Sequence, residues 1–224
     1  MKILSIDTAS NLCTVAVLEN ENCIKEIVVN DARNHSEKIM PVIEQALSES
    51  NSTLQDIDLI VCDKGPGSFT GIRIGVGTVL AFKDSLNIPC IGISSLEALA
   101  YNINTDGIIC TLIDAKNDNV YFGVFEKKNN IVTQLEDYSF KTIEEIIPIL
   151  NKYNQIIFVG DGSTHHKEFL HSNFNTSTFS DKNDLSSFSL GLAGLNAYNK
   201  NTNFDLMPLY LRKSQAERAL ENKQ

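Results

Sequence analysis

The stretch KGPGSFTG, residues 64–71, follows the apolar run 59–62 and opens a long apolar segment that reaches about Asn87. Gly65 and Gly67 supply backbone freedom on either side of a proline whose φ is fixed. Ser68 or Thr70 can cap the unpaired N–H groups of a first helical turn. The stretch therefore predicts a strand that runs through a tight turn into a long helix, and this unit is the expected centre of the fold.

The predicted helix is apolar on two sides. One side carries ordinary core residues at helical spacing: Phe69, Ile72, Val76, Val79 and Leu80. The other carries only small residues: Ser68, Gly71, Gly75 and Thr78. Glycine inside a helix costs roughly 1 kcal/mol relative to alanine, so close approach of a partner helix is expected to compensate. Packing of the small residues on the chain's own sheet is the alternative.

The expected partner surface combines this helix with a preceding helix, predicted from His35 to about Ser50 with Pro41 inside it. The residues expected at the interface are Ile39, Met40, Ile43, Ser68, Gly71, Ile74, Gly75, Thr78 and Phe82.

Composition indicates an ordinary globular chain of 224 residues with a net charge of −9. No block of basic residues is present except Arg212-Lys213, which argues against autonomous binding to nucleic acid. Five scattered cysteines fall in predicted strands and are expected to be buried and structural in a reducing cytoplasm: Cys13, Cys23, Cys62, Cys90 and Cys110. We recognise no signal peptide and no apolar run long enough for a membrane span.

The order of predicted elements repeats once along the chain. Residues 1–103 contain strands at 2–8, 12–19, 23–30, 56–63 and 88–93, with helices at 35–50, 68–87 and 95–102. Residues 104–211 contain strands at 108–113, 119–125, 131–136 and 155–159, a helix at 142–152, a turn at 160–163 and a helix at 182–197. We expect an N-terminal lobe over 1–103, a reduced C-terminal lobe over 104–211, and a tail over 212–224 that is either a partner-binding helix or solvated.

The run GPGSFTGIRIG, read with the opening ILSIDTA at 3–9 and IDAK at 113–116, resembles the TsaB (YeaZ) family. The likeness is dense over residues 1–125. It implies a two-lobed α/β fold of the actin, Hsp70 and sugar-kinase superfamily, which is also the layout of the repeated element order.

In that superfamily, two hairpins hold the phosphates of ATP between the lobes. The corresponding turns here begin at Asp7-Thr8 and at Asp114, and neither contains the glycine that lets a backbone approach phosphate closely. We therefore expect Asp7 and Asp114 to bond their own turns, and we expect no catalytic residue, cofactor or metal site on this chain. A phosphate site at the start of the central helix is the weaker alternative, because the lysine of a P-loop is missing there.

The resemblance implies a non-catalytic scaffold for formation of N6-threonylcarbamoyladenosine at position 37 of tRNA. It implies pairing with a catalytic TsaD subunit, cooperation with a TsaE ATPase, homodimers through the first-lobe helices, and only indirect contact with tRNA. ATP and metal then belong to the partners. The alternative from another class is a stand-alone enzyme, either a small ATPase or phosphotransferase, which the fold alone favours, or a metalloprotease-like protein.

The four histidines, His35, His165, His166 and His171, lack the spacing of a helical metal-binding pair. We expect His35 to orient the entry of the first helix and the others to be surface or capping residues.

Overall fold

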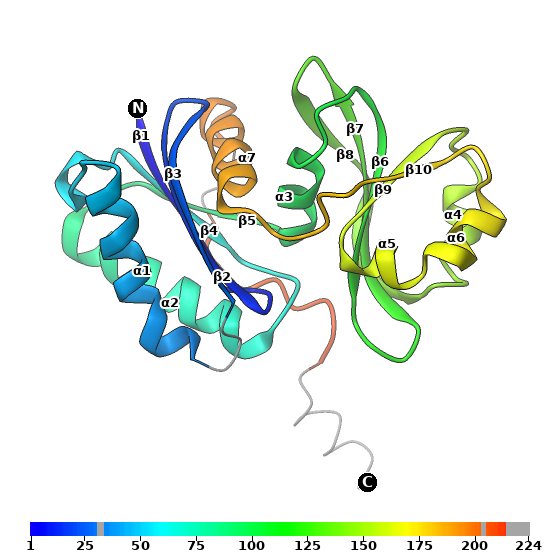
Figure 1. The fold of residues 1–224 in the computed structure, drawn as a ribbon, viewed down its shortest axis with the longest axis horizontal. Coiled ribbons are helices and arrows are strands. Elements are labelled where there is room, and N and C mark those ends of the chain that lie inside the picture. Colours follow the sequence, from blue (N-terminus) through cyan, green and yellow to red (C-terminus); the bar gives the residue numbers. More distant parts are fainter. Residues whose placement is uncertain (31–33, 203–204, 214–224) are drawn as a thin grey trace, which may run out of the picture.

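Two five-stranded sheets form the frame of the molecule (Figure 1). The structure is a computed structural model that describes residues 1–30, 34–202 and 205–213. The first sheet has the order β3-β2-β1-β4-β5 and the second the order β10-β9-β6-β7-β8. In each sheet three strands that are consecutive in the sequence pair antiparallel: β1, β2 and β3 in the first sheet, and β6, β7 and β8 in the second. On its other side the first of these strands pairs in parallel, β1 with β4 and β6 with β9, and one further parallel strand follows in each sheet. The repeated element order predicted from the sequence is thus a repeated sheet topology.

The first sheet and its helices follow the predicted order closely. The elements are β1 (Lys2–Asp7), β2 (Leu12–Glu19), β3 (Asn22–Asn30), α1 (His35–Glu49), the short 3-10 helix Leu54–Asp56, β4 (Leu59–Asp63), α2 (Phe69–Leu86), β5 (Cys90–Ile93) and α3 (Ser95–Tyr101). Strands β1 and β4 are almost wholly buried because helices cover both faces of the sheet. Ser68 caps α2 as predicted, since its side chain accepts from the Gly71 N–H at 3.2 Å.

The second half of the chain departs from the sequence prediction in several places, and the elements at 167–173 and 178–179 were not predicted. Its elements are β6 (Gly107–Asp114), β7 (Asn119–Lys128), β8 (Ile131–Thr142), α4 (Ile147–Leu150), β9 (Ile156–Val159), α5 (Asp161–His165), α6 (Lys167–Asn173), β10 (Thr178–Phe179) and α7 (Ser187–Asn199). The predicted helix at 142–152 shrinks to α4: residue 142 belongs to β8, and residues 143–146 form turns before the helix begins. The predicted turn at 160–163 instead begins α5, and the last helix starts at Ser187 and not near 182.

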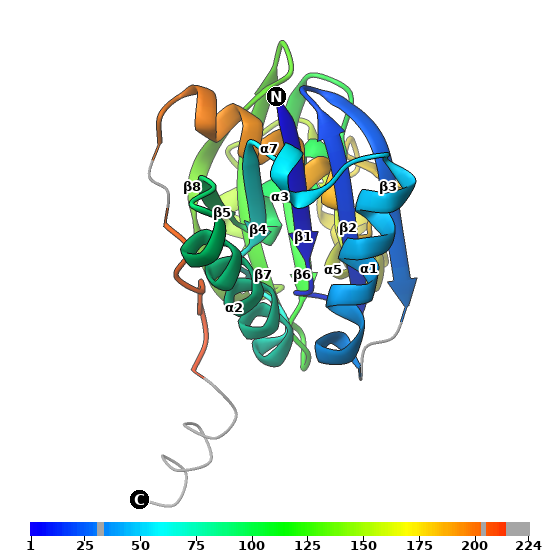
Figure 2. The same ribbon diagram turned by 90° about the vertical axis from the view of Figure 1, so that its left-hand side faces the viewer.

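Each sheet is built from one half of the chain, but the helices that cover the first sheet come from both halves. Helices α1 and α2 cover one face of the first sheet (Figure 2). Helix α7, from the second half of the chain, packs on the opposite face of that sheet, and α3 packs between α7 and the second sheet. A Cβ added at Gly194 would lie 2.3 Å from Val61, so only glycine permits this approach. The first lobe is therefore completed by a helix about 90 residues after its last strand.

The core extends from the first sheet through α3 and α7, and a smaller cluster lies beneath α4 and α6. Four of the five cysteines are buried, but Cys23 is exposed, so the prediction of burial was wrong there. Its strand β3 is the edge of the sheet, and its side chain points outward. In the described part of the chain, none of the helices is long and apolar enough to cross a membrane.

Candidate functional site

A cavity of 520 Å³ lies between the two sheets at the ends of β1 and β6. It is bordered by both turns that the sequence analysis singled out, by the loop before α2 and by the start of α5: Ala9, Ser10, Asn11, Leu12, Asn30, Pro66, Gly67, Ser68, Leu99, Ile113, Asp114, Ala115, Lys116, Tyr121, Asp161, Asn183, Asp184 and Leu185. The fold thus brings together Ser68 and Asp114, which are 46 residues apart in the sequence.

The first turn is closed on itself. The Asp7 carboxylate accepts from the Ala9 N–H at 2.6 Å, as the sequence analysis predicted. Asp7 is 1% exposed and lies beneath the cavity floor, not on its surface. Thr8 is also buried, and its hydroxyl donates to the Gly71 carbonyl at 2.7 Å. The side chains of this turn therefore form hydrogen bonds with backbone groups of the same chain, Asp7 with Ala9 N–H and Thr8 with the Gly71 carbonyl.

The loop before α2 docks on the first turn. Ser68 N–H donates to the Ala9 carbonyl at 2.7 Å, and the Ser68 side chain caps the N–H of Gly71 in the first turn of the helix. A Cβ added at Gly67 would lie 2.3 Å from the Ala9 carbonyl oxygen. Glycine is required here because two stretches of backbone touch, not because a phosphate approaches.

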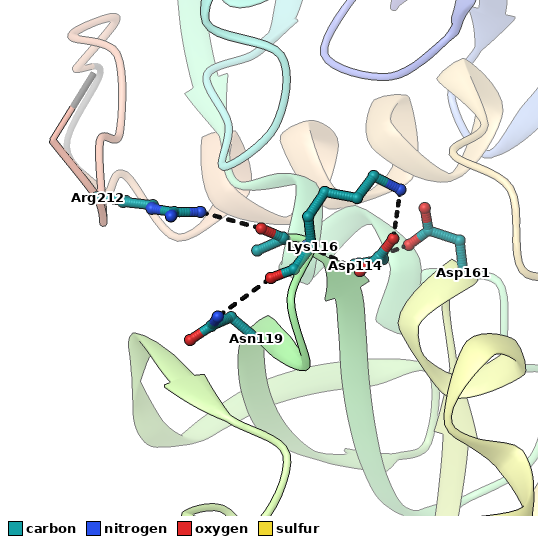
Figure 3. Close-up of polar contacts among 6 residues, drawn as sticks. Asp114, Lys116, Asn119, Asp161 and Arg212 are labelled. Atoms are coloured by element: carbon teal, nitrogen blue, oxygen red, sulfur yellow. Dashed lines mark hydrogen bonds and ion pairs between the residues drawn. The ribbon is translucent and has the colours of Figure 1, made fainter. Parts of the chain in front are cut away.

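The second turn replaces glycine with three consecutive left-handed residues, Lys116, Asn117 and Asp118, whose φ angles are 66°, 53° and 57°. Figure 3 shows how side chains hold this conformation. Asp114 accepts from the Lys116 N–H at 2.9 Å and from its ammonium at 2.5 Å, while Asn119 donates to the Lys116 carbonyl at 3.1 Å. Burial alone would raise the pKa of Asp114, but the hydrogen bonds from Lys116 outweigh it, and the net shift is downward. The prediction that Asp114 bonds its own turn is confirmed.

The cavity is acidic. Asp114, Asp161 and Asp184 line it against Lys116, whose ammonium is already paired with Asp114. The Asp161 carboxylate accepts from the Asp114 N–H at 2.9 Å, so it serves the second turn as well (Figure 3). A phosphate would meet a negative field, and the N–H groups of Ala9, Ser68 and Lys116 already have acceptors.

The small-residue side of α2 faces the chain's own first turn. Gly71 and Gly75 are buried, and a Cβ at Gly75 would lie 2.6 Å from the Thr8 hydroxyl oxygen. The premise that these glycines are exposed to a partner helix in the free chain was wrong. The small stripe exists because β1 and its turn pass directly beneath α2.

The other predicted interface residues divide by exposure. Ile39 and Ile43 are buried against the first sheet, so they are unavailable on the surface. Met40 and Ser68 are exposed, and Ile74, Thr78 and Phe82 are half-buried. On the outer face of α1 and α2, Met40 and Leu80 are exposed apolar side chains among mostly polar and charged residues.

Sequence reasoning missed Gly77. A Cβ added there would meet nothing within 4 Å, and the residue is exposed. Its cost to the helix, about 1 kcal/mol relative to alanine, has no compensation within the described chain. The available signal was a third glycine two residues after Gly75, on the opposite side of the helix.

The C-terminal segment Asp205–Lys213 crosses from one lobe to the other. The Leu209 N–H donates to the Lys64 carbonyl at 2.7 Å, and the Tyr210 ring stacks on Phe69 at 4.2 Å. Arg212 then donates to the Ala115 carbonyl at 3.0 Å in the second turn (Figure 3). The predicted tail is therefore packed at its first residues, and its remainder, 214–224, lies outside the described residues.

The cysteines and histidines form no reactive site among the described residues. Burial raises the pKa of the Cys13 and Cys90 thiols to about 11, which opposes nucleophilic use. His35 opens α1 as predicted, and its ring bonds the Ser10 carbonyl at 3.0 Å, tying the helix to the first turn. The described residues contain no group of three or more His, Cys, Asp or Glu side chains placed to hold a metal ion.

Comparison with known sequences identifies close similarities. The family model described as TsaD, tRNA N6-adenosine threonylcarbamoyltransferase, matches residues 23–220. The tRNA threonylcarbamoyladenosine biosynthesis protein TsaB of Bacillus subtilis is 34% identical over 181 residues, which cover 80% of this chain and 79% of that protein. The TsaB protein of Haemophilus influenzae is 28% identical over 226 residues, covering 95% and 94%.

Solved structures agree on the fold. YeaZ from Pseudomonas aeruginosa superposes with a TM-score of 0.77 at 22% identity, covering 94% of this chain and 99% of that one. The ROK hexokinase of Thermus thermophilus superposes with a TM-score of 0.52 at 10% identity, covering 90% and 99%. The predicted two-lobed fold of the sugar-kinase superfamily is confirmed.

Proposed function

The chain belongs to the TsaB (YeaZ) family, and from this premise we propose that it serves the biosynthesis of N6-threonylcarbamoyladenosine in tRNA as a non-catalytic scaffold. In this role it pairs with a TsaD-like catalytic subunit. A TsaE-like ATPase completes the system, and ATP and metal are held by the partners.

The observation that carries the non-catalytic role is the state of the inter-lobe cavity. The N–H groups of Ala9, Ser68 and Lys116, at the three backbone segments that would surround a phosphate chain, already donate within the protein. Asp7 is buried below the cavity, and the cavity itself is lined by three aspartates. Because these three donors would have to give up internal acceptors, and because the aspartates repel phosphate, nucleotide binding here is disfavoured.

The outer face of α1 and α2 supports the pairing role. It presents the exposed apolar side chains of Met40 and Leu80, and at Gly77 a partner helix can approach the backbone without a side chain in between. The same face can join two copies of the chain, so the homodimer and the complex with TsaD would compete for it. A net charge of −9 favours indirect contact with tRNA through a basic partner.

Reconstitution tests this function. The chain is combined with the TsaD-like and TsaE-like proteins of its own cell, unmodified tRNA, Mg-ATP and threonylcarbamoyl-adenylate as donor, and modified adenosine in tRNA is measured by mass spectrometry of the digested nucleosides. We expect modification only when this chain is present, and no hydrolysis of Mg-ATP by the chain alone. Modification that proceeds equally well without it, or ATP turnover by the isolated chain, would overturn the proposal.

A further inference from the structure

Two buried carboxyl groups meet at the ends of neighbouring parallel strands. Asp7 ends β1 and Asp63 ends β4, and the residues just before them, Ile6 and Cys62, are paired in the sheet. Each side chain is 1% exposed. Continuing this register places Asp7 beside Asp63, so the two side chains lie at adjacent positions on the same face of the sheet. The charge of Asp63 is second only to burial among the influences that raise the pKa of Asp7.

The donors around the pair reach only one oxygen of each carboxyl group. Asp7 Oδ1 accepts from Ala9 N–H at 2.6 Å, and Asp63 Oδ1 accepts from Gly65 N–H and from the Ser95 hydroxyl, both at 2.6 Å. Both Oδ2 atoms are buried, and no donor of the described residues reaches either of them. Two adjacent buried carboxylates repel one another, and a proton on one of them removes this repulsion.

Among the described residues, no cation is found to lower the pKa of either carboxyl group. The Glu26 carboxylate of β3 adds a further charge that raises the pKa of Asp7, and burial, followed by charge from the pair, raises the pKa of the Cys13 thiol on β2 and of the Cys62 thiol on β4. Lys64 follows Asp63 in the chain, but its ammonium lies 3.6 Å from Asp205 on the C-terminal segment. We propose that Asp7 and Asp63 bind one proton between them, so that a neutral carboxylic acid donates to the neighbouring carboxylate at the base of the two cavity loops.

The proton makes the stability of the first lobe depend on pH. Burial, followed by the neighbouring Asp63, raises the pKa of Asp7, and burial also raises the pKa of Asp63. A raised pKa in the folded state stabilises the fold fully below the unfolded value near 4, and this contribution is lost as the pH rises through the folded value. The site acts on the free chain and does not depend on the proposed function.

Asparagine substitutions test the shared proton in the full chain. Asp63→Asn keeps an Oδ1 acceptor for Gly65 and Ser95 and places an NH₂ group where the proton lies. We expect its melting temperature to exceed that of the native chain by at least about 2 °C at pH 8, and the difference to shrink toward pH 5. Asp7→Asn should behave in the same way.

The double variant Asp7→Asn/Asp63→Asn is the decisive member of the set. It places two donors face to face, so it should melt below both single variants, and the native infrared band of a protonated carboxyl group should disappear in all three. Asp84→Asn, at an exposed carboxylate of α2, is the matched control and should leave that band in place. Additive effects of the two single substitutions, with a melting difference that does not change with pH, would overturn the proposal.

Discussion

Substitution of two glycines of α2 by leucine separates internal packing from partner binding. Gly75 and Gly77 lie two residues apart in one helix, but only Gly75 is buried. A Cβ at Gly75 would lie 2.6 Å from the Thr8 hydroxyl oxygen, whereas a Cβ at Gly77 would meet nothing within 4 Å. The same change therefore has opposite consequences for stability at the two positions.

Gly75→Leu should destabilise the isolated chain. The added side chain displaces Thr8 from the Gly71 carbonyl, which it now reaches at 2.7 Å, and a buried hydrogen bond broken in this way costs about 1–3 kcal/mol. Overpacking costs a further 1–3 kcal/mol or so, and leucine recovers about 1 kcal/mol of helix propensity. The net loss of about 1–5 kcal/mol should lower the melting temperature by roughly 2–4 °C for each kcal/mol.

Gly77→Leu should instead raise the melting temperature by about 2–4 °C, because only helix propensity changes. Its affinity for the TsaD-like partner should fall roughly 5- to 150-fold, since a bulky side chain enters a close helix contact. Thermal unfolding and a binding titration on both variants measure the two effects. An unchanged melting temperature for Gly75→Leu would refute the packing argument, and native affinity for Gly77→Leu would refute the partner surface.

Three further outcomes follow from the described contacts. Asp114→Ala should lower the free energy of unfolding by about 1 kcal/mol through the lost turn contacts, without loss of any intrinsic turnover. In the native chain the folded-state pKa of Asp114 is lowered, so its contribution to stability is lost as the pH falls below about 4 through that folded-state pKa. A denaturation series over pH should therefore show the stability difference between variant and native chain shrinking in this range. Replacement of all five cysteines by alanine or valine should leave tRNA modification by the reconstituted complex intact wherever folding survives. In the native chain the exposed Cys23 should be the first cysteine to react with a thiol reagent, as measured by mass spectrometry of the labelled protein. Tyr210→Ala removes the stack on Phe69 and the acceptor of Arg73, so hydrogen exchange over residues 205–213 should accelerate while α3 stays protected; unchanged exchange would contradict the observed packing of this segment.

The sequence predicted the elements well where local pattern decides them. The capped start of α2 at Ser68 and the start of α1 at His35 follow from capping chemistry and helical spacing, and both are confirmed. The prediction for residues 142–152 gave the right type of element but too long a helix, since residue 142 belongs to β8 and residues 143–146 form turns. Its apolar residues Ile143, Ile146 and Leu150 are in the core as a helical spacing suggests, so spacing alone did not locate the start of the helix. The packing of α7 on the first sheet depends on contacts between residues such as Thr14 and Ser187, 173 positions apart, which no local pattern encodes.

The cavity shows a similar division between local chemistry and spatial arrangement. Missing glycines correctly indicated that Asp7 and Asp114 would bond their own turns. The meeting of Asp7 with Asp63 was not predicted, although each ends a predicted strand. The antiparallel meander at 2–30 leaves β1 open on one side, and only the addition of β4 along that side aligns the two strand ends.

The error on the small residues of α2 has a geometric origin. A helix turns by about 100° per residue, so Gly71 and Gly75 share a side while Gly77 lies about 200° away from Gly75. Sequence spacing therefore reveals which glycines belong together, but it does not reveal which side meets the sheet when both sides look apolar. The contact of Gly71 and Gly75 with Thr8 decides this, and it assigns the uncompensated glycine, Gly77, to the outer face. If that face is the partner surface, the glycine that matters for assembly is Gly77, because no contact within the described chain requires a glycine at that position.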